Sequence, residues 1–111
     1  MLYINAKKRV SLNKFRLVIY NYIKKNRLHY SDQRERILKI LHTQNYPVSA
    51  EFISKELKKE KIGAGCATVF RHLKFFEELE LVIVVNKIPK GYLLKIDIDC
   101  DEVEVLQSEI E

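Results

Sequence analysis

The chain has 111 residues, which is enough for one domain with a single modest core. Hydrophobic residues make up 47% of it, and only two prolines and three glycines occur, which is not the composition of a disordered chain. The net charge of +5 is unevenly spread. Residues 1–96 hold all 20 Lys and Arg with only eight acids, whereas residues 97–111 hold seven acids and no base. A body with a charge of +12 predicts a polyanionic partner, most often nucleic acid.

Several other classes of protein are not indicated. The longest apolar run is the five residues from Leu81 to Val85, far short of the roughly 20 that a membrane span needs. The N-terminus mixes charged and apolar residues, so no signal peptide is predicted. Two lone cysteines, Cys66 and Cys100, form no CxxC pair and do not suggest a disulfide scaffold. We expect a cytoplasmic protein with reduced thiols.

Two helices are predicted in the first part of the chain. The first covers residues 11–25 with Ser11 as its N-cap, and it is basic and amphipathic. Such a helix can bind a membrane surface, but packing on the domain is the interpretation we favour. The second begins with Ser31 as N-cap, or with the capping-box spacing of Asp32 and Glu35, and runs to about His42.

A third helix is predicted from Ala50 to about Glu60, with Ser49 as its N-cap. A turn that contains Gly63 and Gly65 leads into a fourth helix over about residues 66–79. The third helix, the turn and the fourth helix form a helix-turn-helix candidate.

The functional interpretation depends mainly on the fourth helix. Its apolar stripe is Val69, Leu73, Phe76 and Leu79, and its other side opens with Thr68, Phe70, Arg71 and Lys74. A glycine stands at its N-cap and its first turn carries no acid, so the free amides there would attract a phosphate. A core helix with a solvated charged face explains this pattern equally well. The predicted elements before and after the helix favour the nucleic-acid interpretation.

Two β-prone runs follow, within about residues 81–96, and the basic loop 86–91 separates them. The tip of this hairpin carries Lys87 and Lys90. The predicted fold is therefore mainly α with a small β-hairpin (α+β): a winged helix-turn-helix over residues 1–96 with an extra N-terminal helix, followed by an acidic tail over residues 97–111.

Four motifs with consistent order and spacing carry a resemblance to a known family. They are Ser31-x-x-Arg34-x-x-Ile37-Leu38, Val48-Ser49-Ala50-Glu51-x-Ile53, Ala67-Thr68-Val69-Phe70-Arg71-x-Leu73 and Phe76-Glu77-Glu78-Leu79-x-Leu81-Val82. The chain from about residue 31 to residue 94 resembles the DNA-binding domain of the ferric uptake regulator family of bacterial repressors. The resemblance implies a homodimeric winged-helix regulator that reads an A/T-rich palindrome in double-stranded DNA.

The resemblance also assigns roles to residues. The family's base- and phosphate-contacting tyrosine and arginine match Phe70 and Arg71, and Phe70 keeps the ring for contact with a thymine methyl group but lacks the hydroxyl donor. A family lysine that probes the minor groove is replaced by His29. The predicted DNA-binding residues are Thr68, Phe70, Arg71, Lys74, Arg34, His29, Lys87 and Lys90.

The family's metal ligands are not matched. Its histidine before the Val-Ser-Ala-Glu motif and its glutamate on the second wing strand correspond to Pro47 and Leu93, and its later histidine-rich cluster corresponds to the stretch 99–102. The CxxC motifs of its dimerisation domain have no counterpart in the 111 residues. We therefore predict no metal and no other cofactor, although the acidic stretch 99–102 could in principle hold a divalent cation.

No enzyme motif is present. The three histidines, His29, His42 and His72, lie on separate predicted elements and share no metal-ligand spacing. Cys66 at a helix start could act as a redox switch, but a small residue that fills a gap is the explanation we favour. We predict no catalytic residues and no small-molecule substrate.

Two functions remain open. The first is a DNA-binding transcription regulator without a metal switch. The second is a protein-interaction winged helix that pairs with a full-length relative and alters its DNA binding. The acidic tail, residues 97–111, also allows two roles. Its apolar positions favour a small dimer interface, whereas its seven acids could instead fold back on the basic body and compete with DNA.

Overall fold

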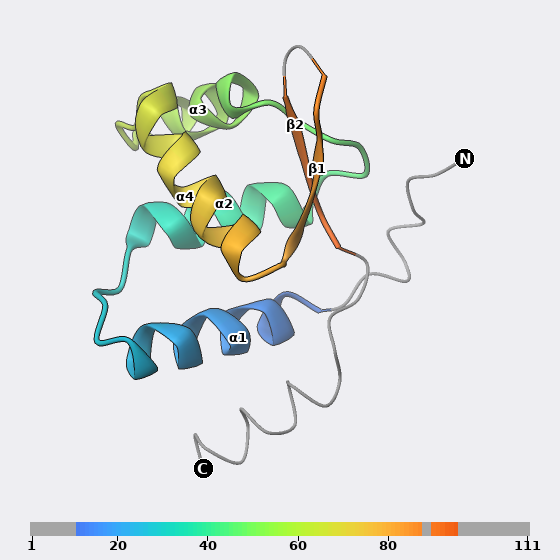
Figure 1. Ribbon diagram of the computed structural model, residues 1–111. Coiled ribbons are helices and arrows are strands. Elements are labelled where there is room, and N and C mark those ends of the chain that lie inside the picture. The colour runs from blue at the N-terminus through green and yellow to red at the C-terminus, as the bar shows by residue number, and fades with distance from the viewer. Residues whose placement is uncertain (1–10, 88–89, 96–111) are drawn as a thin grey trace.

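The computed structural model describes residues 11–87 and 90–95 (Figure 1). It contains four helices and one antiparallel hairpin, so the predicted α+β winged helix-turn-helix is confirmed. The elements are α1 (Leu12–Lys25), α2 (Asp32–His42), α3 (Ala50–Lys59), α4 (Cys66–Glu78), β1 (Val82–Val85) and β2 (Gly91–Leu94). The predictions for the acidic tail and for Cys100 lie outside the described residues.

Serine side chains begin two of the helices. The hydroxyl oxygen of Ser31 accepts a hydrogen bond from the backbone N–H of Arg34 at 3.1 Å, which identifies Ser31 as the N-cap of α2. Ser49 caps α3 in the same way by accepting from the N–H of Phe52. Ser11 occupies the N-cap position of α1, but its side chain makes no capping hydrogen bond. The two serine caps fix where α2 and α3 begin.

Three helices end in a left-handed turn that contains no glycine. Arg27, Lys61 and Glu80 follow α1, α3 and α4 with φ of 52°, 61° and 58°. In each case the next residue donates its backbone N–H to a carbonyl five positions back, as Ile62 does to Leu57 at 3.0 Å. The sequence analysis predicted a turn that contains Gly63 and Gly65 before α4. Lys61 supplies the left-handed residue of this turn, and no glycine among the described residues has a positive φ.

The core forms where the apolar stripes of all four helices meet the hairpin. Phe15, Ile37, Leu41, Ile53 and Phe76 have no exposed surface. Leu79, the last residue of the predicted stripe of α4, is only partly buried at the edge of this core. Burying each large apolar side chain contributes about 1.5–3 kcal/mol, so these residues dominate the stability of the domain.

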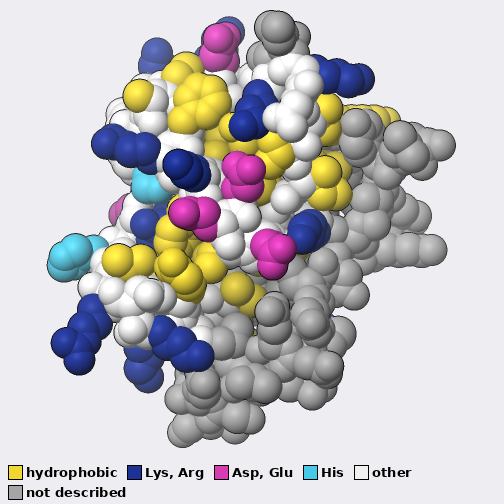
Figure 2. All heavy atoms as spheres, viewed as in Figure 1, with side chains coloured by type: hydrophobic (Ala, Val, Ile, Leu, Met, Phe, Trp, Pro, Cys, Tyr) yellow, Lys and Arg dark blue, Asp and Glu magenta, His cyan; other side chains and the backbone are white. Residues whose placement is uncertain are grey.

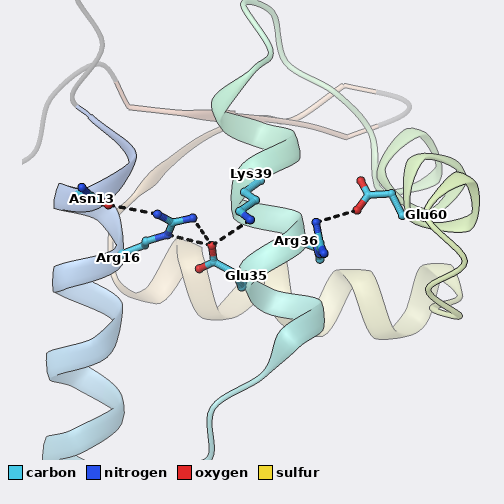
Figure 3. A network of polar contacts seen from close by, with 6 residues as sticks. All are labelled: Asn13, Arg16, Glu35, Arg36, Lys39 and Glu60. Carbon is cyan, nitrogen blue, oxygen red and sulfur yellow. Dashed lines mark hydrogen bonds and ion pairs between the residues drawn. The ribbon is translucent and has the colours of Figure 1, made fainter.

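Helix α1 packs on the domain, as the sequence interpretation favoured, and polar contacts join it to α2 (Figure 3). The guanidinium of Arg16 donates to Glu35 of α2, with 2.8 Å between Nε and Oε2, and to Asn13 of its own helix. Lys39 lies 3.9 Å from the same carboxylate. A partly exposed ion pair contributes at most about 1 kcal/mol, so the buried Phe15 holds α1 more strongly than the polar contacts do.

A third chain segment pairs with the hairpin, which the sequence did not predict. Strands β1 and β2 pair with Ile83 opposite Leu93, and Tyr92 of β2 also forms a bridge with Val48. The two backbone hydrogen bonds of this bridge measure 2.9 and 2.8 Å. Because Val48 directly precedes the N-cap of α3, the bridge fixes the wing against the helix-turn-helix unit.

Within the parts of the chain that the structure describes, no helix is long and apolar enough to cross a membrane.

The close approach of β2 to Pro47 gives the first prediction. A Cβ atom at Gly91 would lie 2.8 Å from the Cβ of Pro47, closer than real Cβ contacts allow. Gly91→Ala should therefore lower the free energy of unfolding by about 1–3 kcal/mol through overpacking. Gly63→Ala is the matched control, because a Cβ there meets nothing within 4 Å and should leave stability nearly unchanged. Urea denaturation measures both, and equal stabilities would contradict the close packing.

Candidate nucleic-acid interface

Helix α4 presents a buried side and an outward side. Val69, Leu73 and Phe76 have no exposed surface, and they direct the opposite side of the helix to solvent. Arg71 and Lys74 are exposed, Phe70 is 46% exposed and Thr68 is half-buried. Figure 1 shows α4 on the near side of the molecule, and Figure 2 shows that this side carries many Lys and Arg side chains with a few acids among them. The structure thus brings the four predicted residues of α4 together on one surface.

The acidic residues of α4 confine this surface to the first half of the helix. No acid occurs in its first turn, whereas the exposed Glu77 and Glu78 lie at its end and Glu80 follows. Carboxylates repel phosphate, so an approaching nucleic acid would meet the residues from Gly65 to Lys74 and avoid the rest. An N-terminal approach of this kind is typical of recognition helices.

Two of the outward side chains are held by neighbours. The guanidinium of Arg71 donates to the hydroxyl oxygen of Thr68 at 3.2 Å, which lays the side chain along the helix toward its N-terminus. The ring of Phe70 meets the ring of Tyr92 edge to face, with centroids 6.5 Å apart. Phe70 therefore lies between α4 and the wing while its remaining surface stays open to solvent.

The turn before α4 is anchored by two side chains that the sequence analysis did not select. The hydroxyl of Ser54, which is 5% exposed, donates to the carbonyl of Ala64 at 2.7 Å. The amide of Gln33 donates to the carbonyl of Gly63 at 3.0 Å. Ser54 lies next to Ile53 on the inward side of α3, so a serine within the apolar stripe was the available signal.

Arg34, near the start of α2, approaches α4, and His29 lies just before that helix. The guanidinium carbon of Arg34 lies 4.1 Å from the ring centroid of Phe75, and one amino group donates to the carbonyl of His29 at 3.4 Å. His29 itself is exposed. Burial lowers the pKa of Arg34 from its ordinary value. The structure therefore brings Arg34 onto α4, whereas His29 contributes only a backbone contact.

His72 was not among the predicted DNA-binding residues, but it lies beside Arg34. Its Nε2 lies 3.2 Å from the amide oxygen of Gln33. Burial lowers the pKa of His72, and the positive charges of Arg34 and Arg71 lower it further. The pattern of one histidine between basic residues was visible in the sequence. Its burial against α2 was not.

The wing lysines stand apart from α4. Lys87 and Lys90 are exposed on the loop between β1 and β2. No hydrogen bond or ion pair is found between these two side chains and α4 among the described residues. They are placed to extend the basic surface beyond the helix, and the structure does not join them to it.

Pro47 and Leu93 stand at positions where the resemblance implies metal ligands. Pro47 and Leu93 carry no donor atom in their side chains, and Leu93 has no exposed surface. In residues 11–87 and 90–95, no three His, Cys, Asp or Glu side chains are grouped as metal ligands. The stretch 99–102 lies outside these residues. Cys66 is a free, half-buried thiol at the start of α4.

Comparison with known proteins decides the family. A sequence profile of the Ferric uptake regulator family matches residues 25–110. The chain belongs to this family. No curated protein sequence matches the chain.

Solved structures share the fold of this chain. The ferric uptake regulator of Helicobacter pylori superposes with a TM-score of 0.72 at 20% identity, over 99% of this chain and 82% of that one. The ferric uptake regulator of Vibrio cholerae matches at 25% identity with a TM-score of 0.55, over 80% of this chain and 82% of that one. A zinc uptake regulator solved with zinc and DNA matches at 21% identity with a TM-score of 0.63, over 78% of this chain and 57% of that one. The chain thus spans little more than half the length of that DNA-bound protein.

The anchoring of the turn before α4 gives the second prediction. Ser54→Ala would leave the carbonyl of Ala64, a residue that is only 6% exposed, without its hydrogen bond. We expect the free energy of unfolding to fall by about 1–3 kcal/mol. Lys55→Ala, at the exposed neighbouring position, should change it by less than about 0.5 kcal/mol. Denaturation of the two variants tests this, and equal losses would show that the bond does not anchor the turn.

Proposed function

We propose that this chain is a DNA-binding transcription regulator in which α4 enters the major groove with its N-terminal half. The observation that carries the proposal is the outward surface of α4, where Arg71 and Lys74 stand beside Thr68 and Phe70 and the acids begin only at Glu77. Membership of a family of regulators and the net charge of +12 over residues 1–96 support it. Such a protein would act on DNA in the cytoplasm.

The surface suggests a role for each basic group. Arg71 can form a bidentate contact with a base edge after it releases Thr68, and Phe70 can contact a thymine methyl group. Lys74 and Arg34 would contact backbone phosphates. Lys87 and Lys90 would add phosphate contacts from the wing, and His29 would reach the minor groove beside α2.

We further propose that two copies read an A/T-rich palindrome as a homodimer. A single copy of α4 covers only one half-site, and a two-fold operator requires a second copy at the matching distance. The zinc uptake regulator that this chain resembles has been solved with DNA, which supports the same mode of binding here.

We propose that DNA binding by this chain does not depend on a metal. The support is the pair of side chains at the family's ligand positions, because neither Pro47 nor Leu93 offers a donor atom.

A second candidate function has one observation in its favour. A hollow of about 700 Å³ lies between α1 and α2. Its lining includes the apolar side chains of Leu17 and Ile23. Tyr20 and Tyr30 at its rim are 53% and 68% exposed. Such a surface could receive a partner protein, which would make the chain a protein-interaction winged helix that modulates a full-length relative.

DNA binding gives the third prediction. The purified protein should bind an A/T-rich duplex, with an affinity that falls steeply as salt rises, because Lys and Arg displace condensed counterions. Arg71→Ala should cost about 1–3 kcal/mol and relax sequence specificity. Lys87→Ala should weaken all sequences alike. Fluorescence anisotropy measures both.

Lys24→Ala, which removes the same charge from the last turn of α1, is the matched control and should leave sequence discrimination intact. If no duplex binds even at low salt, the regulator proposal is wrong and the interaction function gains support.

Metal independence gives the fourth prediction. DNA affinity should be the same with added zinc, manganese or iron(II) as with a chelator, because the two matched ligand positions hold Pro47 and Leu93. Elemental analysis should find no stoichiometric transition metal in the purified protein. One tightly held metal per chain would contradict this prediction and direct attention to the stretch 99–102.

A further inference from the structure

Three side chains that carry or can gain a positive charge lie near one another where the start of α2 lies against α4. Arg34 comes from α2, and Arg71 and His72 come from α4. We name these three residues the α2–α4 cluster. Among the described residues, no carboxylate lies within ion-pair distance of any member. The cluster therefore has a local excess of positive charge with no internal counterion.

Arg34 is half-buried without an anion beside it. Its guanidinium lies over the ring of Phe75 and donates to a backbone carbonyl, that of His29. Its Nε is buried and has no hydrogen-bond partner. An incompletely paired cation in a partly buried place is costly. An anion that reaches its outer amino groups would offset this cost.

The contacts of His72 determine which of its nitrogens can titrate. The amide nitrogen of Gln33 donates to the carbonyl of Gly63, so its amide oxygen is the atom that faces Nε2 of His72 at 3.2 Å. An oxygen acceptor there requires Nε2 to carry a hydrogen. Nδ1 is then the nitrogen that is free of a proton in the neutral ring and gains one when the ring becomes charged.

We propose that Arg34 and His72 of the α2–α4 cluster bind a phosphate of the DNA backbone beside the major groove, while Arg71 adds its positive charge nearby, and that His72 takes up a proton at Nδ1 on binding. The proposal rests on the proposed function, because it requires α4 to lie in DNA. It adds His72 to the interface and makes the interaction depend on pH.

The sign of the pH dependence follows from the charges around His72. Burial, Arg34 and Arg71 all lower its pKa from 6.5, so the ring is neutral in the free protein at pH 7. A bound phosphate offsets the two positive charges and accepts a hydrogen bond from Nδ1–H, which raises the pKa of His72 in the complex. Affinity then increases as pH falls through the pKa of the complex and levels off below that of the free protein, by about tenfold for each unit between them.

The experiment measures DNA affinity by anisotropy from pH 8 to pH 5.5, with an A/T-rich duplex at constant ionic strength. The wild-type protein should bind more tightly at the acidic end. His72→Gln, which keeps an amide near Gln33 but cannot titrate, should lose most of this increase. His42→Gln is the matched control, since His42 lies in the last turn of α2, at the other end of that helix from Arg34, and it should keep the increase. The opposite result for the two variants would overturn the proposal.

Two measurements on the wild-type protein avoid any doubt about the folding of a variant. An NMR titration should show the pKa of His72 higher in the complex than in the free protein. A duplex in which the contacted phosphate is replaced by a neutral methylphosphonate, found by scanning the backbone, should lose the pH dependence. An unchanged pKa of His72 on binding would overturn the proposal.

Free phosphate at the same ionic strength separates the two sources of the anion. If it raises the pKa of His72 as much as DNA does, the cluster is a site for small anions and the assignment to the backbone is wrong. If DNA binds with an affinity that does not change with pH, only this inference is overturned. Absence of DNA binding at every pH sinks the proposed function with it.

Discussion

The burial of Val69, Leu73 and Phe76 is the constraint on which the surface of this protein depends. All three have no exposed surface, and together they fix the rotation of α4 about its axis. A rotation by one residue would replace them in the core with Phe70, Lys74 and Glu77. Burying two charges without partners costs several kcal/mol, so the alternative rotation is strongly disfavoured. Core packing thus decides which side chains of α4 can meet a partner.

The position of α4 along its axis depends on a different set of contacts. Ser54 and Gln33 hold two successive carbonyls of the preceding turn, and Lys61 takes the left-handed conformation that ends α3. A non-glycine residue in that conformation costs about 1–2 kcal/mol. The hydrogen bond from Ile62 back to Leu57 and the burial of its neighbours offset this cost. Polar contacts within the scaffold therefore place the helix that the apolar core has oriented.

The chain retains the fold of the ferric uptake regulator family. At two positions, however, its side chains differ chemically from the metal ligands that the resemblance implies. Pro47 and Leu93 stand where the resemblance implies metal ligands, and both serve packing: Pro47 lies against Gly91, and Leu93 is fully buried. Arg34 and His72, where α2 meets α4, are the two groups on which the proposed phosphate contact rests.

The sequence alone determined the elements and the outward residues of α4, because helical periodicity, serine caps and turn residues are local properties. It also carried the family resemblance through four short motifs. Only the tertiary structure decided how distant segments meet: the bridge between Val48 and Tyr92, the bond from Ser54 to Ala64, and the placement of Arg34 beside His72. These contacts join residues from different elements, and their burial and pKa shifts arise from packing that no local pattern encodes.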